Sequence, residues 1–462
     1  MSSVKSIAVI GLGYVGLPLT LLAANKGFRT YGIEIDARKL SSLKDGKSYV
    51  DDISDSDITD SKVDFTDNIA AVSKVDAVII CVPTPVDENR QPDLGIVKSA
   101  VSSIAPHLKK GTLVVVESTI NPGVCDEIVV PLLEEKSGKK VGTDIYLAHC
   151  PERINPGDKT WSVRNINRVV GANSKVELEK AVELYSGLID AEIKPMGSLK
   201  EAEAVKIVEN SFRDINIAFV NELAMSFHKL GINLENVIDG AATKPFAFMA
   251  HRPGCGVGGH CIPVDPYYLI EYAHTHGFDH SFLRLARNIN ESMPQFTVDL
   301  LTESLDRLEL PVKGTKVALL GLSYKSNVGD SRESPAKVIR ALLEDAGVKL
   351  SVYDPYIDDS TAKTLSSALK GAKAIVIATG HDEFKAISVN KLKAAGVQAV
   401  IDGRNIFRSH ISEFVKYNII YEGVGVSSTD SRPLEQQLSS TDAIKVNNSN
   451  DLRPTTGAKE NI

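Results

Sequence analysis

The chain has 462 residues, of which 43% are hydrophobic and 24% are charged, and its formal net charge is -7 at pH 7. This length exceeds what one hydrophobic core usually organises, so we expect two or three domains of ordinary globular composition. The negative net charge, without a cluster of lysines and arginines, argues against a nucleic-acid-binding surface.

The cysteines and the first apolar segment indicate the cellular compartment. Five cysteines at irregular spacing do not form the pattern of a disulfide framework, so a reducing compartment is favoured. Residues 7–24 are apolar enough to be mistaken for a signal peptide, but Gly11, Gly13, Gly16 and Pro18 lie within them, as a strand, a turn and a helix require. We therefore expect a cytoplasmic protein that makes no contact with a membrane. The cysteines are Cys81, Cys125, Cys150, Cys255 and Cys261.

Residues 1–195 have the pattern of an α/β domain. A β-branched run at 6–10 leads into a glycine-rich turn and an apolar helix at 17–26. Continuous apolar strands that alternate with helices predict a parallel sheet covered on both faces. Further strands are expected at 30–35, 75–82 and 112–117, with 145–149 and 168–170 extending the sheet. We expect this domain to be a Rossmann domain that binds NAD.

The rest of the chain is helical first and then α/β again. Residues 200–230 contain few helix breakers and predict one long helix, a natural hinge and dimer surface, within a helical region at 196–309. A second doubly wound domain is expected at 310–425, and the polar tail 426–462 is expected to be disordered. The second set of strands is predicted at 316–320, 349–354, 374–378 and 399–402. The predicted fold class is α/β, with two Rossmann-like doubly wound domains joined by a long central helix.

The first glycine-rich turn predicts a dinucleotide site. Glycines there permit a tight turn, close approach of a pyrophosphate and close helix packing, and the helix N-terminus offers N–H groups to the phosphates. Glu34 follows about twenty residues on, where a carboxylate binds the ribose hydroxyls and repels a 2′-phosphate, so NAD is favoured over NADP. Asp36, just past the strand, remains the alternative ribose ligand. The turn residues predicted to contact the cofactor are Gly11, Gly13, Tyr14, Val15 and Gly16.

Two threonines lie where later strands of this sheet end. Thr84 and Thr119 follow the third and fourth predicted strands. Ligands of open parallel sheets bind beyond the carboxyl ends of the strands, so both are predicted cofactor contacts. The alternative is that each hydroxyl only stabilises a turn.

Three further segments carry residues typical of catalysis. Cys150-Pro151-Glu152-Arg153 follows a strand, and Lys206 and Asn210 lie one helical turn apart on one face. Cys261 follows a loop with four glycines, which allows a substrate to approach the backbone closely. A metal site is the alternative use of these residues, but the cysteines lack a paired Cys-x-x-Cys spacing, so no metal is predicted.

The order of these motifs resembles the UDP-glucose/GDP-mannose dehydrogenase family over residues 1 to about 425. The resemblance is carried by Gly-x-Gly-Tyr-Val-Gly, Pro-Glu-Arg, Lys-x-x-x-Asn, Gly-Gly-His-Cys with Asp265 four residues after Cys261, and Gly-Leu-x-x-Lys. It implies two Rossmann-like domains, a homodimer formed through the long helix, and a UDP-sugar as substrate. Cys255 stands where the family more often has proline, which predicts a less rigid loop.

The resemblance also implies catalytic roles. Cys261 would capture the C6 aldehyde as a thiohemiacetal, which a second oxidation converts to a thioester, so that one sugar reduces two NAD molecules. Asp265 would activate the hydrolytic water or tune the thiol, and Lys206 and Asn210 would stabilise the developing oxyanion. Glu152 would act as, or organise, a general base, although a glutamate after proline is also often a cap.

Substrate contacts follow from the same resemblance. Lys325, in Gly321-Leu322-Ser323-Tyr324-Lys325, and Arg332 would meet the diphosphate or complete the site. The remaining predicted substrate contacts are Arg153, Arg213, Arg252 and Gly258.

Pro-Glu-Arg followed by Asn-Pro-Gly, and the segment 244–249, resemble the branch that acts on UDP-N-acetylhexosamines. UDP-N-acetylglucosamine is favoured, with UDP-N-acetylmannosamine or UDP-glucose as the alternative. Two other classes of protein are the alternative functions. A two-electron hydroxyacid dehydrogenase has no use for Cys261, and an NAD-sensing scaffold leaves the catalytic set unexplained.

Overall fold

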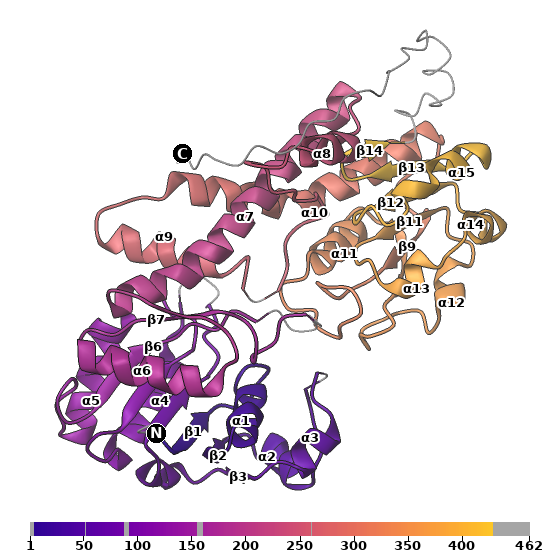
Figure 1. Ribbon diagram of the computed structural model, residues 1–462. Helices are drawn as coiled ribbons and strands as arrows, with labels where there is room; N and C mark the ends of the chain where they lie inside the picture. The colour runs from indigo at the N-terminus through magenta and orange to yellow at the C-terminus, as the bar shows by residue number, and fades with distance from the viewer. Residues whose placement is uncertain (1–3, 51, 87–91, 155–159, 260, 428–462) are drawn as a thin grey trace, which may run out of the picture.

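Two α/β units are joined by a long helix (Figure 1). The computed structural model describes residues 4–50, 52–86, 92–154, 160–259 and 261–427. Helix α7 (Leu199–Leu230) runs from the first unit to the second. The predicted fold class, two Rossmann-like α/β domains joined by a long central helix, is therefore confirmed for the described residues.

The first unit is a parallel sheet in the order β3-β2-β1-β4-β5-β6. Successive residues of its central strands are buried on opposite faces: Ile7 packs with α1 and α6, whereas Ala8 packs with α4 and α5. Such two-sided burial explains the continuous apolar strands. The elements are β1 (Ser6–Ile10), α1 (Gly16–Asn25), β2 (Arg29–Ile33), α2 (Ala37–Lys44), α3 (Asp55–Thr59), β3 (Val63–Thr66), β4 (Ala77–Ile80), α4 (Gly95–Ile104), β5 (Leu113–Val116), α5 (Val130–Ser137), β6 (Tyr146–His149), β7 (Arg168–Val170), α6 (Lys175–Leu188) and β8 (Ile193–Pro195).

One predicted strand does not join this sheet. Residues 168–170 form β7, which pairs in parallel with β8 as a separate two-stranded sheet. Its link to the end of β6 is an isolated antiparallel bridge between His149 and Gly171. The prediction that 168–170 extends the main sheet is therefore wrong, because the partner of a three-residue strand is chosen by distant contacts. The edge strand β3 was not predicted at all.

The central region consists of helices packed along α7. Ser198 caps the first turn of α7 by accepting the N–H of Glu201, and Gly231 ends the helix with a φ of 65°. Val220 and Ala224 of α7 pack against Met293 of α10, so the two long helices share a small core. The further helices are α8 (Leu234–Ala242), α9 (Asp265–Thr275) and α10 (Ser281–Arg307).

The second unit is a sheet in the order β10-β9-β11-β12-β13-β14, parallel except for β14. Helix α10 covers one face together with α11, and α12 and α14 cover the other. Its elements are β9 (Lys316–Leu320), α11 (Pro335–Asp345), β10 (Lys349–Tyr353), α12 (Leu365–Leu369), β11 (Ala374–Ile377), α13 (Asp382–Lys385), α14 (Val389–Ala395), β12 (Ala399–Asp402), α15 (Ile411–Lys416), β13 (Ile420–Gly423) and β14 (Val426–Ser427).

The predicted polar tail begins too early. Val426 and Ser427 form β14, pair with β13 and are almost completely buried, because Val426 is an apolar residue that completes the sheet edge. The predicted disorder of 428–462 lies outside the described residues. Among the helices of the described residues, none has the length and apolarity that a bilayer crossing requires.

Candidate active site

Cys261 and Asp265 lie together at the start of α9. The carbonyl oxygen of Cys261 accepts the backbone N–H of Asp265 at 2.8 Å and that of Val264 at 3.0 Å, which closes the first turn. The carboxyl group of Asp265 is buried, with 3% of the residue exposed. The sequence spacing of four residues therefore brings the thiol and the carboxyl group to one end of a helix.

Helix α7 supplies the polar partners of Asp265. The amide nitrogen of Asn210 donates to Oδ2 of Asp265 at 2.5 Å. Burial raises the pKa of Asp265 to about 6, while the positive charge of Lys206 and the bond from Asn210 oppose the increase. Asn210 acts on this carboxyl group through a hydrogen bond and Lys206 through its charge, and their role as donors to an oxyanion stays a prediction.

The thiol of Cys261 is strongly disfavoured as an anion in this chain. Burial raises the pKa of Cys261 to about 12, and the charge of Asp265 acts in the same direction. Lys206, Arg332 and Arg213 oppose the increase, so these three cations surround the thiol. A thiol, a carboxyl group that titrates near neutral pH and several cations thus converge at one point, which suits addition of sulfur to a carbonyl group.

The second α/β unit forms one wall of this site. A Cβ placed on Gly258 would lie 2.8 Å from Cβ of Tyr324, and one on Gly259 would lie 2.8 Å from the Tyr324 ring. The N–H of Gly259 donates to the carbonyl of Arg332 at 3.1 Å. The glycines are therefore needed for close contact with residues 324–335, and the predicted substrate contact of Gly258 stays a prediction. Lys325, next to Tyr324, is half-buried.

The start of the cysteine loop is fixed by Cys255 and a buried polar chain. Cys255 is fully buried, and its N–H donates to the carbonyl of Gly403 at 2.9 Å, a bond that proline could not make. This bond holds the loop against the end of β12, and the expectation of a less rigid loop stays a prediction. Next to it, the N–H of Gly254 donates to Asn221 at 3.0 Å, and Asn221 donates to Asn290 at 2.8 Å.

This polar chain continues to an ion pair between α7 and α10. Asn290 donates to Asp214 at 2.8 Å, and Arg287 donates to the same carboxylate at 2.6 Å. Asp214 follows Asn210 by one helical turn, so one stripe of α7 carries both the catalytic candidates and the support of the loop. Sequence analysis missed this chain; the only signal was polar residues at helical spacing on otherwise apolar faces.

The glycine-rich turn of the first unit fits a dinucleotide. Gly11 has a φ of 87°, and a Cβ on Gly16 would lie 1.9 Å from the carbonyl oxygen of Gly11. No atom comes within 4 Å of a Cβ on Gly13, so that side of the turn is open to a pyrophosphate. Residues Tyr14 and Val15 lie in this turn, ahead of α1. The tight turn and the open side at Gly13 fit the close approach of a dinucleotide pyrophosphate.

The two candidate ribose ligands differ in their contacts. Glu34 lies just beyond β2, and its carboxylate accepts the N–H of Leu12 at 3.0 Å, so it is held at the glycine-rich turn. Asp36 instead caps α2 by accepting the N–H groups of Arg38 and Lys39, and it pairs with the Arg38 side chain. Glu34, whose second carboxylate oxygen accepts the N–H of Asp36 at 3.0 Å, thus lies beside the turn, and its role as the ribose ligand stays a prediction.

Tyr268 links the cysteine segment to the first unit. Its hydroxyl donates to the carbonyl oxygen of Thr84 at 2.6 Å, and the residue is fully buried. Tyr268 lies on α9, one turn after Asp265, so one short helix contacts both the catalytic group and the loop that follows β4. Thr119 is half-buried beyond β5. Cofactor contact by Thr84 and Thr119 stays a prediction.

Glu152 is bound to a buried arginine and to the backbone of its own loop. Its Oε2 lies 2.7 Å from Nη2 of the fully buried Arg168, and its Oε1 accepts the N–H groups of Arg153 and Ile154 at 2.6 Å. Glu117 lies 3.7 Å from the same guanidinium, and burial raises the pKa of Glu117 to about 7 against the effect of Arg168. Glu152 thus fixes the conformation of its loop, and a role as general base stays a prediction.

The remaining arginines lie at different places. Arg153 pairs with Glu209 of α7, at 2.5 Å, beside Asn210. Arg252 lies farther along, where Nη1 is 2.5 Å from Glu235 of α8. In contrast, Arg213 and Arg332 belong to the thiol's surroundings. Residues 155–159 and His260 of the predicted motifs lie outside the described residues.

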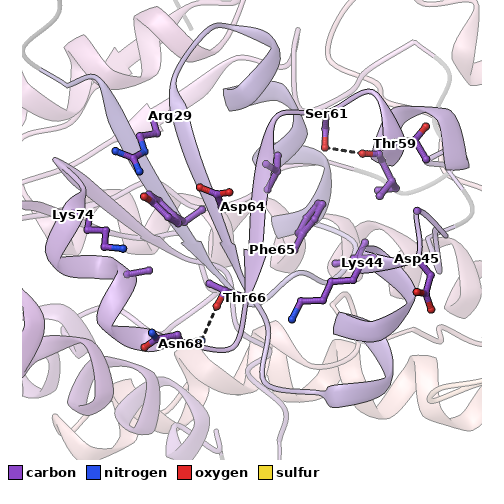
Figure 2. A pocket seen from close by; sticks show the side chains of 16 residues that line it. Arg29, Lys44, Asp45, Thr59, Ser61, Asp64, Phe65, Thr66, Asn68 and Lys74 are labelled. Atoms are coloured by element: carbon purple, nitrogen blue, oxygen red, sulfur yellow. Dashed lines mark hydrogen bonds between the residues drawn. The ribbon is translucent and has the colours of Figure 1, made fainter.

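A recess on the outer side of β2 and β3 is separate from these groups. It has a volume of about 780 Å³ and lies around the free edge of β3, between Arg29, Asp64 and Lys74 on one side and Lys44 and Thr59 on the other (Figure 2). None of the predicted site residues lines it. Both basic and acidic side chains line the recess, so its charge does not indicate a particular class of ligand.

Comparison with known proteins covers all three parts of the chain. Residues 5–189 match the NAD binding domain of the UDP-glucose/GDP-mannose dehydrogenase family, 200–292 its central domain and 318–409 its UDP binding domain. The chain is 36% identical to UDP-N-acetyl-D-mannosamine dehydrogenase from Pyrococcus horikoshii over 91% of its length and 99% of that protein. It is 37% identical to UDP-N-acetyl-D-glucosamine 6-dehydrogenase from Pseudomonas aeruginosa, over 84% of this chain and 94% of the relative.

Solved structures give the same result. The structure of UDP-D-ManNAc dehydrogenase from Pyrococcus horikoshii superposes with a TM-score of 0.85 at 35% identity, covering 92% of this chain and 100% of that one. The UDP-N-acetyl-mannosamine dehydrogenase Cap5O from Staphylococcus aureus gives a TM-score of 0.79 at 33% identity, with 92% and 100% coverage.

Proposed function

This chain belongs to the UDP-glucose/GDP-mannose dehydrogenase family, and we propose that it oxidises the C6 hydroxyl of a UDP-N-acetylhexosamine to a carboxylate. It is an NAD-dependent oxidoreductase of the UDP-sugar 6-dehydrogenase type. UDP-N-acetylglucosamine is the favoured substrate, and UDP-N-acetylmannosamine or UDP-glucose is the alternative. The observation that carries the proposal is the convergence of Cys261, Asp265, Lys206 and Asn210 against the second α/β unit.

The four groups account for a four-electron oxidation. Removal of two electrons from the alcohol gives an aldehyde, to which the sulfur of Cys261 adds as its proton leaves, forming a thiohemiacetal. Removal of two more electrons gives a thioester, and attack of water releases the acid and restores the thiol. NAD, when bound, supplies the hydride acceptor for each oxidation.

The protein groups act on charge and protons. Lys206 and Asn210 supply donors for the oxyanion that develops when sulfur or water adds to the carbonyl carbon. With a pKa of about 6, Asp265 is ionised at neutral pH and can take the proton of the thiol or of the hydrolytic water. The cations near Cys261 oppose the increase in its pKa, so they lower the cost of forming the thiolate.

A panel of UDP-sugars tests this function. We expect NADH formation, followed by absorbance, with UDP-N-acetylglucosamine in preference to UDP-N-acetylmannosamine and UDP-glucose. Two NADH should form per sugar consumed, with a uronic acid as product. Turnover of UDP-glucose alone would overturn the N-acetylhexosamine assignment, and one NADH per sugar with release of aldehyde would overturn the four-electron reaction.

We also propose that the enzyme is a homodimer formed along α7. Val208, Phe212 and Phe219 of α7 are about half exposed, and Phe246 and Met249 of the following loop are about two-thirds exposed. The His251 ring contacts the Phe212 ring edge-on, so this loop lies against the helix. An exposed apolar surface of this kind favours association with a second copy. Five cysteines that form no disulfide support the proposed cytoplasmic location.

A further inference from the structure

The second α/β unit repeats the glycine turn of the first. Gly11 and Gly321 both have positive φ, 87° and 96°, and each N–H donates to the end of the neighbouring strand at 2.9 Å. In each unit a carboxylate beyond the second strand accepts the N–H of the leucine after the glycine. Glu34 accepts that of Leu12 at 3.0 Å, and Asp354 accepts that of Leu322 at 2.6 Å.

The two carboxylates differ in what surrounds them. Asp354 also accepts the N–H of Ser323 at 3.0 Å, the Ser323 hydroxyl at 3.1 Å and the N–H of Tyr356 at 2.7 Å. His381, which follows β11, also contacts this carboxylate, with Nε2 3.1 Å from Oδ2 of Asp354. Burial raises the pKa of Asp354, but these hydrogen bonds outweigh burial and hold that pKa well below its usual range. Protein groups therefore fill the position where a Rossmann turn accepts a ribose.

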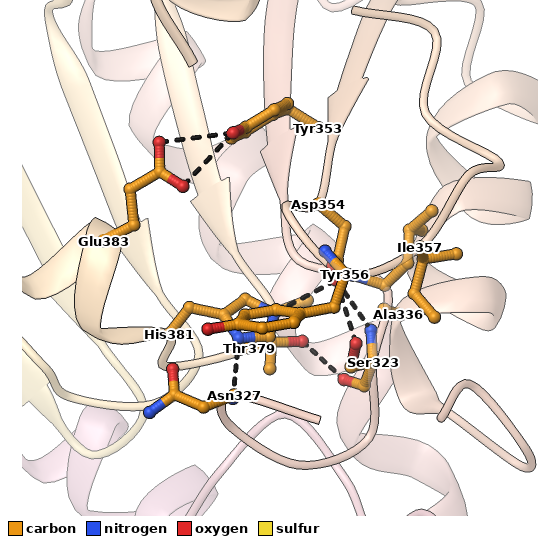
Figure 3. Close-up of polar contacts among 12 residues, drawn as sticks. Ser323, Asn327, Ala336, Tyr353, Asp354, Tyr356, Ile357, Thr379, His381 and Glu383 are labelled. Carbon is orange, nitrogen blue, oxygen red and sulfur yellow. Dashed lines mark hydrogen bonds and ion pairs between the residues drawn. The ribbon is translucent and has the colours of Figure 1, made fainter. Parts of the chain in front are cut away.

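His381 has a single tautomer consistent with its contacts. The N–H of Asn327 donates to Nδ1 at 2.9 Å, so Nδ1 carries no proton and Nε2 must donate to Asp354. The ring is fully buried, and the Tyr356 ring lies over it with centroids 5.0 Å apart (Figure 3). His381 thus connects Asp354 to a second point of the same loop.

Both ends of the loop 322–327 are consequently fixed. Asp354 binds Leu322 and Ser323 at its start, and His381 binds Asn327 at its end. Asn327 adopts a φ of 60° and exchanges hydrogen bonds with Asp382, which holds it in this left-handed conformation. Three residues lie between these fixed points: Tyr324, which contacts the cysteine loop, Lys325 and Ser326.

We propose that Asp354 and His381 are positioning residues for the UDP-sugar, because they hold the loop 322–327 in the conformation that places Tyr324 against the cysteine loop and presents Lys325 to the diphosphate. The inference rests on the proposed oxidation of a UDP-sugar, in which Lys325 is expected to meet the diphosphate. It also explains why the repeated glycine turn serves the substrate rather than a second dinucleotide: its carboxylate is already saturated by Ser323, Tyr356 and His381.

Two substitutions of His381 separate positioning from a general packing role. In His381→Asn the amide oxygen takes the place of Nδ1 and keeps an acceptor for Asn327, whereas in His381→Gln the amide nitrogen takes the place of Nε2 and keeps only the donor to Asp354. Tyr353→Phe is the matched control, since its hydroxyl binds Glu383 in the same unit and touches no part of the loop (Figure 3).

UDP binding by calorimetry and steady-state kinetics with NAD and the UDP-sugar measure the effect. We expect His381→Gln to raise the Kd for UDP and the KM for the sugar about tenfold, and His381→Asn about threefold or less. The kcat and the Kd for NAD should stay within about twofold, as they should in Tyr353→Phe.

The contrary outcomes are distinct. Equal effects of the two His381 variants, or a fall in kcat and NAD affinity of the same size, would assign His381 to packing and overturn the inference. If the unmodified protein bound no UDP at all, the proposed function would fail together with it. Thermal melting of each variant shows whether the second unit is folded.

Discussion

The amide of Asn210 and the carboxyl group of Asp265 are 2.5 Å apart, and this contact joins the long helix to the cysteine loop. Asn210 and Asp265 are separated by 55 positions in the chain. A shift of α7 along its axis would therefore change the surroundings of Cys261 directly. The long helix thus contributes to the candidate active site and also connects the two α/β units.

Asp265 predicts how activity depends on pH. Because its pKa is about 6, we expect kcat to fall below pH 6 as the carboxylate becomes protonated and can no longer accept a proton. Asp265→Asn should lower kcat at least a hundredfold and remove this acidic limb. The measurement is a pH profile of kcat at saturating substrate, and an unchanged limb in Asp265→Asn would contradict the assignment.

The same pKa predicts a change in stability. The folded-state pKa of Asp265, about 6, lies above the value of about 3.9 for an unfolded chain, so the folded protein binds the proton more tightly between these values. Its contribution to stability is therefore lost as pH rises from 4 to 6. Asp265→Asn cannot ionise, so its Tm relative to the unmodified protein should increase over that window and then level off. A constant difference in Tm would refute the shifted pKa.

Cys261 predicts a separation of cofactor binding from acid formation. Cys261→Ala removes the sulfur but leaves the glycine turn 11–16 untouched, so NAD should still bind while formation of the uronic acid disappears. Cys261→Ser should form an ester that hydrolyses more slowly, so mass spectrometry should detect acylated enzyme. Cys125→Ala, a buried thiol of the first unit, is the control and should keep its activity. Full activity of Cys261→Ala would refute the covalent mechanism.

Glu34 predicts cofactor preference. We expect NAD to be strongly preferred over NADP, and Glu34→Ala to narrow the preference because it removes the charge that repels a 2′-phosphate. Asp36→Ala is the matched control: it removes the cap of α2 and should leave the ratio of activity with NAD to activity with NADP unchanged. Equal use of both cofactors by the unmodified enzyme would show that Glu34 does not select them.

Asn221 predicts coupling between helix packing and the cysteine loop. Asn221→Leu leaves the buried N–H of Gly254 and the amide oxygen of Asn290 without their partner, which should cost about 2–4 kcal/mol of unfolding free energy and lower kcat. Gln295→Leu makes the same kind of change on α10, where the exposed side chain donates to Asp299 of its own helix, and should have little effect. Denaturant titration and kcat of both variants test the difference.

Tyr268 predicts communication between the cysteine segment and the cofactor loop. Tyr268→Phe removes the bond to the Thr84 carbonyl, so the loop after β4 should become less well positioned and the Kd for NAD should rise about threefold to tenfold. Tyr272→Phe, on the same helix, removes an exposed bond to Glu127 and is the control. An unchanged Kd for NAD in Tyr268→Phe would separate Thr84 from cofactor binding. UDP affinity should not change in either variant.

Local patterns predicted much of the fold and part of the site. Strands β1, β9 and β12 and helix α7 have almost the predicted bounds, because apolar periodicity and glycine turns depend on neighbouring residues. The spacing of Lys206 and Asn210 placed them on one face, and the spacing of Cys261 and Asp265 placed them at one helix end. Beyond that, the sequence could not show that β7 pairs with β8 rather than with β6.

The alternation of strands and helices, the glycine turn and the residue types of the site can be inferred from the amino-acid sequence, because each depends on contacts within a few positions. Which charged side chains become partners depends on the tertiary structure. Asp265 faces Asn210 near the thiol, whereas Glu152 is bound to Arg168 in the first unit and Asp354 to His381 in the second. These partners are joined by the packing of whole helices and sheets, and the free energy of that packing is spread over many distant residues. No short stretch of sequence therefore contains the information that selects them.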